Sequence, residues 1–208
     1  MKRSTFIALA VTVGVATAGC SATIPGTPTA ATSLSAGRQA THSSQVVLPF
    51  DNHNVIMLAG IAVDAADNLY VLDFYGQAWQ MAPGADKPKL VFTDLGRPVD
   101  AATDAAGNLY VTDVSQNRVL KLAPRFSDPT VLPFTSLTRP TAVAVDTRGN
   151  VYVTDQNANR VLKLDAGASS PTALPFNGLY GPCGVAVDSK GNVYLSDLSV
   201  RILKLPAL

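Results

Sequence analysis

The sequence has 208 residues, of which 47% are hydrophobic and only 15% are charged, a composition typical of a folded globular chain. Sixteen basic and fifteen acidic residues give a formal charge of +1, which excludes the strongly basic surface that nucleic-acid binding requires. Two cysteines are too few for a disulfide framework, and no apolar stretch after residue 20 is long enough to span a bilayer.

Residues 1–20 have the features of an export signal. A basic start is followed by an apolar run from Phe6 to Val15 and then by small residues. Cys20 comes directly after these small residues, in a position that resembles the lipobox of bacterial lipoproteins. The resemblance implies that the signal peptide is removed before Cys20, that the thiol is lipidated, and that the protein is anchored on the extracytoplasmic side of the cell membrane. An ordinary secreted protein with an incidental Cys20 is the alternative.

Residues 21–44 consist mainly of Ser, Thr, Ala, Pro and Gly and carry a single charge, Arg38. Such a segment buries too little apolar surface to offset the entropy lost on ordering. We therefore predict a disordered tether, followed by one globular domain over residues 45–208.

The predicted domain repeats with a period of about 42 residues. The same asparagine marks each copy, at Asn68, Asn108, Asn150 and Asn192. Each copy contains four short runs that are rich in β-branched residues or alternate between apolar and polar residues, which predicts four antiparallel strands. Four such copies predict an all-β fold, a β-propeller of four four-stranded blades.

An aspartate opens the turn between the first two strands of a copy. In the third copy, Asp146 is followed by Gly149, which suits the left-handed position that closes such a turn. Asp67 replaces this glycine in the first copy. We predict structural roles for the repeated charges: turn formation by Asp104, Asp146 and Asp188, and ion pairs that join Asp113 to Arg118 and Asp155 to Arg160.

The motifs GVAVD, GN, VYVTD and NRVLKL resemble NHL repeats. With the VLPF run added, the unit resembles the extracellular sensor domain of the mycobacterial serine/threonine protein kinase D. The resemblance covers residues 45–208 and includes no kinase domain, because the glycine-rich nucleotide loop and the His-Arg-Asp loop are both missing. It implies an extracytoplasmic propeller that acts as a binding, sensor or scaffold module. That sensor is generally a six-bladed ring, whereas this chain has residues for four blades.

The VLPF runs predict how the propeller closes. Pro133 removes a backbone donor from its run, so this strand should be the outermost strand of its blade. The domain begins with such a run at residues 46–50 and ends with a third strand at residues 201–205. We predict that residues 46–50 pair with the last blade and close a ring, which removes two exposed sheet edges. An open arc and a ring completed by a second molecule are the alternatives.

Two sets of loops should lie on one face of the propeller, where binding residues concentrate on a rigid scaffold. This face is the candidate site for a protein, peptide or glycan of the cell envelope. Its candidate ligand-binding residues are His53, Asn54, Phe74, Tyr75, Arg97, Gln116, Asn117, Arg139, Gln156, Asn157 and Tyr180. Asp100, on an inner strand where the other copies have Gly or Ala, is added as a carboxylate near the axis.

No catalytic, metal or cofactor site is predicted. The sequence contains no GxSxG, HExxH, CxxC or P-loop motif. His42 lies in the tether, and His53 alone does not supply a metal triad. Cys183 is expected to be a buried, unpaired thiol with a packing role. We predict a binding module without enzyme activity; the alternative is a metal-dependent lyase or lactonase that resembles streptogramin lyases or gluconolactonases and uses Asp100.

Overall fold

The computed structural model describes residues 46–50, 57–125 and 128–207. These residues form fifteen strands, and none of them belongs to a helix long and apolar enough to cross a membrane. The predicted signal peptide at 1–20, Cys20 and the predicted tether at 21–44 lie outside the described residues.

The strands form four antiparallel sheets, the blades, in which the strands follow one another in chain order. The inner strands are β1 (Leu58–Val63), β5 (Pro98–Thr103), β9 (Pro140–Val145) and β13 (Pro182–Val187). The second strands are β2 (Leu69–Asp73), β6 (Leu109–Asp113), β10 (Val151–Asp155) and β14 (Val193–Asp197). The third strands are β3 (Ala78–Met81), β7 (Arg118–Leu122), β11 (Arg160–Leu164) and β15 (Arg201–Leu205). The outer strands are β4 (Lys89–Phe92), β8 (Thr130–Val131) and β12 (Thr172–Ala173).

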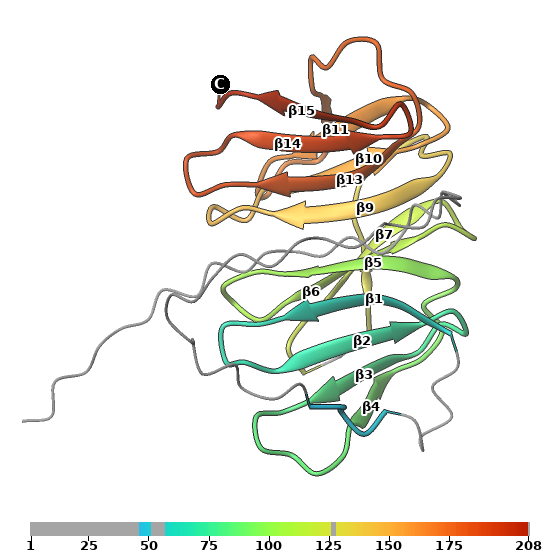
Figure 1. The fold of residues 1–208 in the computed structure, drawn as a ribbon, viewed down its shortest axis with the longest axis vertical. Coiled ribbons are helices and arrows are strands. Elements are labelled where there is room, and N and C mark those ends of the chain that lie inside the picture. Colours follow the sequence, from blue (N-terminus) through green and yellow to red (C-terminus); the bar gives the residue numbers. More distant parts are fainter. Residues whose placement is uncertain (1–45, 51–56, 126–127, 208) are drawn as a thin grey trace, which may run out of the picture.

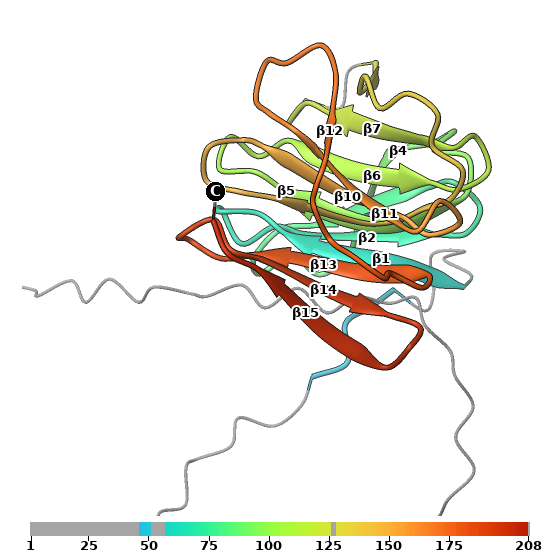
Figure 2. The same cartoon turned by 90° about the horizontal axis from the view of Figure 1, so that it is seen from above.

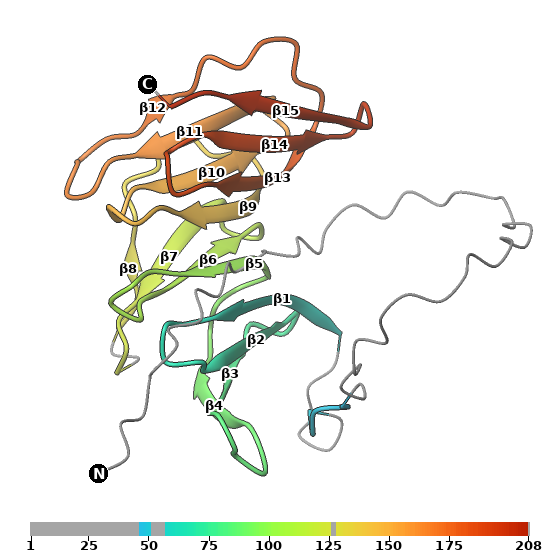
Figure 3. The same cartoon turned by 60° about the vertical axis from the view of Figure 1, so that its left-hand side comes forward.

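The inner strands lie side by side in the order β1, β5, β9, β13 (Figure 1). A second view shows the same order, with the first and the last blade at opposite ends of the molecule (Figure 3). Seen from above, β15 forms a free edge of the last blade (Figure 2). The β-propeller fold predicted from the repeats is confirmed, and its four blades form an open arc.

The last blade has three strands, β13, β14 and β15, as expected from a sequence whose last repeat ends with a third strand. Residues 46–50 form no strand. Figures 1 and 3 place this cyan segment at the first-blade end of the arc, away from β15. Residue 50 is only eight positions from Leu58 at the start of β1, and two whole blades lie between β1 and β13. The predicted pairing of residues 46–50 with the last blade is therefore not formed.

The predicted turn role of the repeated aspartates is confirmed. Asp146 accepts hydrogen bonds from the backbone N–H groups of Arg148 and Asn150 at 2.9 and 3.0 Å. Its second oxygen accepts from the Asn150 amide at 2.7 Å and from the Tyr152 hydroxyl at 3.0 Å. Gly149 closes the turn with φ +82°, and Asp67 takes the same left-handed conformation in the first blade with φ +61°. Equivalent bonds surround Asp64, Asp104 and Asp188.

The hydrophobic core consists of three seams between neighbouring blades. The seam between blades two and three joins Tyr110 and Val119 to Val143 and Val153. Blades one and two meet in a second such cluster, and blades three and four in a third. Each seam removes the facing side chains of two sheets from water, so each blade depends on its neighbours for stability.

Candidate functional site

A buried aspartate ends each second strand and fixes the loops at this end of its blade. Asp113 Oδ1 accepts hydrogen bonds from the backbone N–H groups of Arg97 and Ser115, both at 3.0 Å. Its Oδ2 lies 2.9 Å from Arg118 Nε. Asp155 Oδ1 accepts from the backbone of Thr138 and Arg139 in the same way. One carboxylate thus joins the segment that enters the blade to the loop that leaves the second strand.

The ion pairs predicted for these aspartates are confirmed. Asp155 Oδ2 lies 3.0 Å from the Arg160 guanidinium, and Asp197 pairs with Arg201 in the last blade. Burial raises the pKa of Asp155, but the hydrogen bonds from Arg139, Thr138 and Arg160 outweigh it, so the net shift is downward. These repeated arginines are therefore engaged inside the scaffold.

Four exposed residues occupy one equivalent position in successive blades, and we call them the loop row: Met57, Arg97, Arg139 and Tyr180. The carbonyl group of each accepts a hydrogen bond from the residue that follows the blade's buried aspartate, at 2.9 to 3.1 Å. The row brings together three residues predicted from the sequence. Met57 was missed because residues 51–57 diverge from the repeat.

Two arginines of the loop row differ from the repeated arginines in their surroundings. Arg97 places its guanidinium 5.3 Å from the centre of the Phe74 ring, in a cation–π contact between blades one and two. Among the described residues, neither Arg97 nor Arg139 forms a salt bridge. Since they occupy equivalent positions in neighbouring blades, they give this face positive charge that no ion pair between described residues offsets.

The aromatic residues of blade one divide into exposed and packed groups. Tyr75 is exposed, as is Tyr180 of the loop row. Phe74 is half-buried and packs against the first seam. Trp79 is buried in its blade and donates a hydrogen bond from Nε1 to Asp73 at 3.4 Å. Of the blade-one aromatics, Tyr75 therefore remains the candidate for contact with a partner.

The other predicted site residues flank the loop row. Gln116, Asn117 and Asn157 are exposed and Gln156 is half-buried, in the loops between second and third strands. The sequence reasoning missed Asn159, whose Oδ1 accepts a hydrogen bond from the backbone of Gly181 at 2.7 Å and so joins blades three and four. His53 and Asn54 lie outside the described residues.

Asp100 does not lie on the exposed face with the others. Its side chain is 2% exposed, and Oδ2 accepts a hydrogen bond from the backbone N–H of Val143 at 3.0 Å, which links β5 to β9. Burial raises the pKa of this carboxyl group to about 6, although hydrogen bonds from Val143 and Ala101 oppose the shift. Over the described residues, no group of three or more His, Cys, Asp or Glu side chains is placed to hold a metal ion.

Cys183 is buried on β13, as predicted, with Sγ 3.6 Å from Ser196 Oγ. It is disulfide-bonded, so the expectation of an unpaired thiol is wrong.

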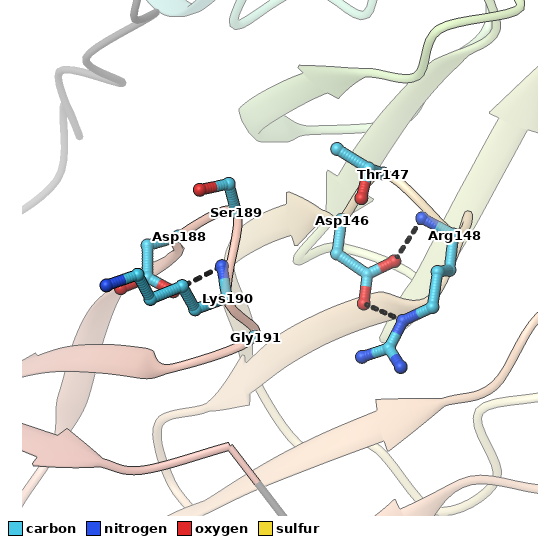
Figure 4. A pocket seen from close by; sticks show the side chains of 7 residues that line it. All are labelled: Asp146, Thr147, Arg148, Asp188, Ser189, Lys190 and Gly191. Atoms are coloured by element: carbon cyan, nitrogen blue, oxygen red, sulfur yellow. Dashed lines mark hydrogen bonds and ion pairs between the residues drawn. The ribbon is translucent and has the colours of Figure 1, made fainter.

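A shallow hollow of about 240 Å³ lies at the opposite ends of the blades, between the hairpin turns of blades three and four. Figure 4 shows Asp146, Arg148, Asp188 and Lys190 around it. Each carboxylate is occupied within its own turn: Asp146 accepts from the backbone of Arg148, and Asp188 from the backbone of Lys190 (Figure 4). The two carboxylates of the hollow are therefore engaged within their own turns, whereas two arginines of the loop row are exposed and form no salt bridge with a described residue.

Residues 137–164 match the family model of the NHL repeat. Among the curated proteins compared with this chain, none matched its sequence. Solved structures with a similar fold include a streptogramin B lyase (16% identity, TM-score 0.59), whose alignment covers 72% of this chain and 54% of the lyase. A chain of the nidogen/laminin complex is also similar (22% identity, TM-score 0.59). The alignment covers 73% of this chain and 65% of that chain. A third similar structure is a catalytically inactive H270A virginiamycin B lyase from Staphylococcus aureus with quinupristin (13% identity, TM-score 0.58). The alignment covers 74% of this chain and 57% of that lyase.

These likenesses establish the propeller fold. The chain spans little more than half of the length of the two lyases and about two thirds of the chain from the nidogen/laminin complex.

The contact between Gly96 and Asp113 allows a test of the buried-aspartate arrangement. Gly96 has φ +77°, and a Cβ there would overlap the Asp113 carboxylate. Gly84 has a similar φ of +72°, but a Cβ there meets nothing within 4 Å. Gly84→Ala should cost only the left-handed backbone penalty of about 1–2 kcal/mol. Gly96→Ala should cost about 2 kcal/mol more, because the carboxylate is also displaced from its donors.

Urea unfolding of both glycine variants measures this difference. Equal losses of unfolding free energy would contradict the view that the Asp113 carboxylate fixes this loop.

Asp100 should make stability depend on pH. Its pKa is raised to about 6 in the folded protein, so the folded state binds this proton more tightly than the unfolded state does. The stability that the protonated carboxyl contributes is complete below about pH 4 and is lost as the pH rises through about 6. Asp100→Asn, which stays neutral, should be more stable than the wild type by up to about 3 kcal/mol above pH 7.

Urea unfolding of the wild type and Asp100→Asn at several pH values between 4 and 8 gives this difference. The other acids titrate identically in both proteins and cancel. A difference that stays constant across this range would show that Asp100 is not the titrating group.

Proposed function

We propose that this chain is a binding module of the cell envelope, whose loop row contacts an acidic protein, peptide or glycan. One observation carries the proposal: Arg97 and Arg139 are exposed at equivalent positions of neighbouring blades and form no salt bridge among the described residues. The loop row ends in Tyr180, which is also exposed. Arginine and tyrosine are the residue types most often found at the energetic centres of protein interfaces.

The rigidity of the scaffold supports this proposal. The backbone N–H groups of Arg97, Arg139 and Tyr180 all donate to buried aspartates. The loop row is therefore held in place before a partner arrives, which lowers the ordering cost of binding. The fold is also compatible with such a role, since a propeller of similar structure occurs in the nidogen/laminin complex.

A lyase is the second candidate, because solved streptogramin and virginiamycin B lyases share the fold. In one of them the replacement of a single histidine is described as inactivating. The two histidines of the present chain, His42 and His53, both lie outside the described residues. We favour binding over catalysis, because the buried acids among the described residues are engaged in turns, loops and backbone bonds. A stoichiometric metal found by elemental analysis would favour the lyase or lactonase.

Membrane attachment through Cys20 is also part of the proposal. It is supported by the basic start, the apolar run and the small residues that precede this cysteine. Two acyl chains at Cys20 would hold the propeller stably at the membrane surface, with residues 21–44 as the link. From the same resemblance to lipoproteins we propose that the domain lies outside the cytoplasm.

Loss of the two unpaired arginines should weaken binding selectively. We expect Arg97→Ala/Arg139→Ala to lower affinity for acidic members of a peptide and glycan array on the order of ten-fold or more. Arg148→Ala/Lys190→Ala removes the same charge from the opposite ends of the blades and serves as the matched control. Equal losses in the two double variants would indicate non-specific attraction, and a wild type without saturable binding would refute the proposal.

Lipidation of Cys20 should be visible in the mass of the mature N-terminal peptide. We expect a diacylglyceryl adduct on Cys20 and recovery of the chain with the membrane fraction, and we expect Cys20→Ser to lose both. The disulfide of Cys183 and lipidation of Cys20 are mutually exclusive states of the chain. Cys20 is the other cysteine of the sequence, and a sulfur in a thioether cannot also form a disulfide. A soluble chain that carries this disulfide would contradict the proposed anchor.

A further inference from the structure

The last blade exposes an apolar side chain at a position that is buried in each of the first three blades. Ile202 on β15 is 76% exposed. The residues at its position in the first three blades are Ala78, Val119 and Val161, and all are 0% exposed. An apolar side chain of this size normally leaves water when its blade has a neighbour.

The first blade shows the complementary exposure on its other side. Ile61 on β1 is 47% exposed, whereas Ala101, Val143 and Val185 at the same position are 0 to 2% exposed. Val63 on the same strand is also exposed. Val71 and Trp79 of this blade are already buried, so the exposed part of this side is its inner strand.

The internal seams show what covers each of these positions. Val119 and Val143 lie in the same core cluster, at the seam between blades two and three. Val161 lies in one cluster with Val185 at the next seam. The natural partner of Ile202 is therefore a residue in the position of Ile61, on the first blade of a propeller.

Residues 46–50 have the same local hydrogen bond as the outer segment of a complete blade, but they do not pair with a third strand. The backbone N–H of Phe50 donates to Leu48 at 2.9 Å, and in the complete blades Phe134 donates to Leu132 at 2.7 Å in the same way. In that blade Leu132 N–H also donates to the Val119 carbonyl at 2.9 Å, and Leu174 does the same to Val161. The equivalent acceptor in the last blade is the carbonyl of Ile202, on the free edge of β15.

Chain length decides which blade can follow a docked segment. In the complete blades, six positions separate the phenylalanine of this motif from the next inner strand, as from Phe134 to Pro140. Eight positions separate Phe50 from Leu58 at the start of β1. If residues 46–50 dock on β15, then β1 must lie beside β13. Within one chain, β1 and β13 are at opposite ends of the arc (Figures 1 and 3).

We propose that two copies of this chain join end to end in a closed ring. In each of two identical joints, residues 46–50 of one copy form the missing outer strand on β15 of the other, and Ile61 packs against Ile202. Such a head-to-tail contact closes into a ring when its rotation is half a turn. It removes both free sheet edges, which otherwise favour aggregation. Two solved proteins with this fold have longer chains, of which this arc covers only 54% and 65%. The fold is therefore compatible with a propeller larger than one copy of this chain.

Charge substitutions at the two exposed positions test the joint in the full chain. Sedimentation equilibrium should give the mass of two chains for the wild type. Ile61→Lys and Ile202→Glu should each give one chain that still unfolds cooperatively, because both side chains are exposed in the single arc. The melting temperature of these single chains should be lower than that of the wild-type ring, because association stabilises the folded state. Val131→Asp changes an exposed residue on the outer strand β8 and should leave the two-chain mass intact.

Mixing the two variants tests the direction of the contact. One joint of the mixed ring is then wild type and the other contains a Lys–Glu pair, so the two-chain mass should return. A wild type of one-chain mass, variants that keep the two-chain mass, or a mixture that stays at one chain would each overturn the proposal.

A photo-cross-linker at Val47 shows whether the segment that pairs with β15 comes from the same chain or from the second copy. The pairings of Leu120 with Val131 and of Leu162 with Ala173 place Val47 opposite Leu203 in the proposed sheet. In a mixture of light and ¹⁵N-labelled full chains, we expect cross-linked peptides from Val47 to β15 that combine light and heavy chains. Cross-links within single chains would instead indicate a ring of four blades and would refute the two-copy joint.

Discussion

The structure depends on a carboxylate that is buried at the end of each second strand. Asp113, Asp155 and Asp197 each accept backbone N–H groups from the incoming segment of the same blade and pair with an arginine from its third strand. A buried carboxylate is stable only when its lone pairs are satisfied. The loops at this end therefore have little freedom, and the side chains that they display keep fixed positions from blade to blade.

Repetition and irregularity have different meanings in this chain. The repeated charged residues form hydrogen bonds and ion pairs within the blades, as the turn at Asp146 and the pair of Asp155 with Arg160 show. Irregular residues at repeated backbone positions, such as Arg97 and Arg139, are presented to solvent. A ligand that contacts the loops therefore meets mainly the residues in which the blades differ.

The seams explain why the ends of the arc differ from its middle. A blade buries one side against the preceding blade and the other side against the next, so three seams leave two sides uncovered. Ile61 and Ile202 are exposed because no blade of the same chain covers their positions, although their side chains are as apolar as those of the buried equivalents. The surface that packs between blades and stabilises one chain is therefore the same surface that would join two copies.

The internal structure of a blade could be predicted from the repeat. Its strand order, the turn at Asp146 and Gly149, and the ion pairs all involve residues that lie close together in the chain. The sequence also pointed to Arg97, Arg139 and Tyr180 as candidate binding residues, since their loops recur at fixed spacing. The contacts between neighbouring blades could not be predicted in this way. The burial of Asp100 against Val143, the packing of Phe74 under Arg97 and the open end at β15 all depend on contacts between different blades, which local spacing does not specify.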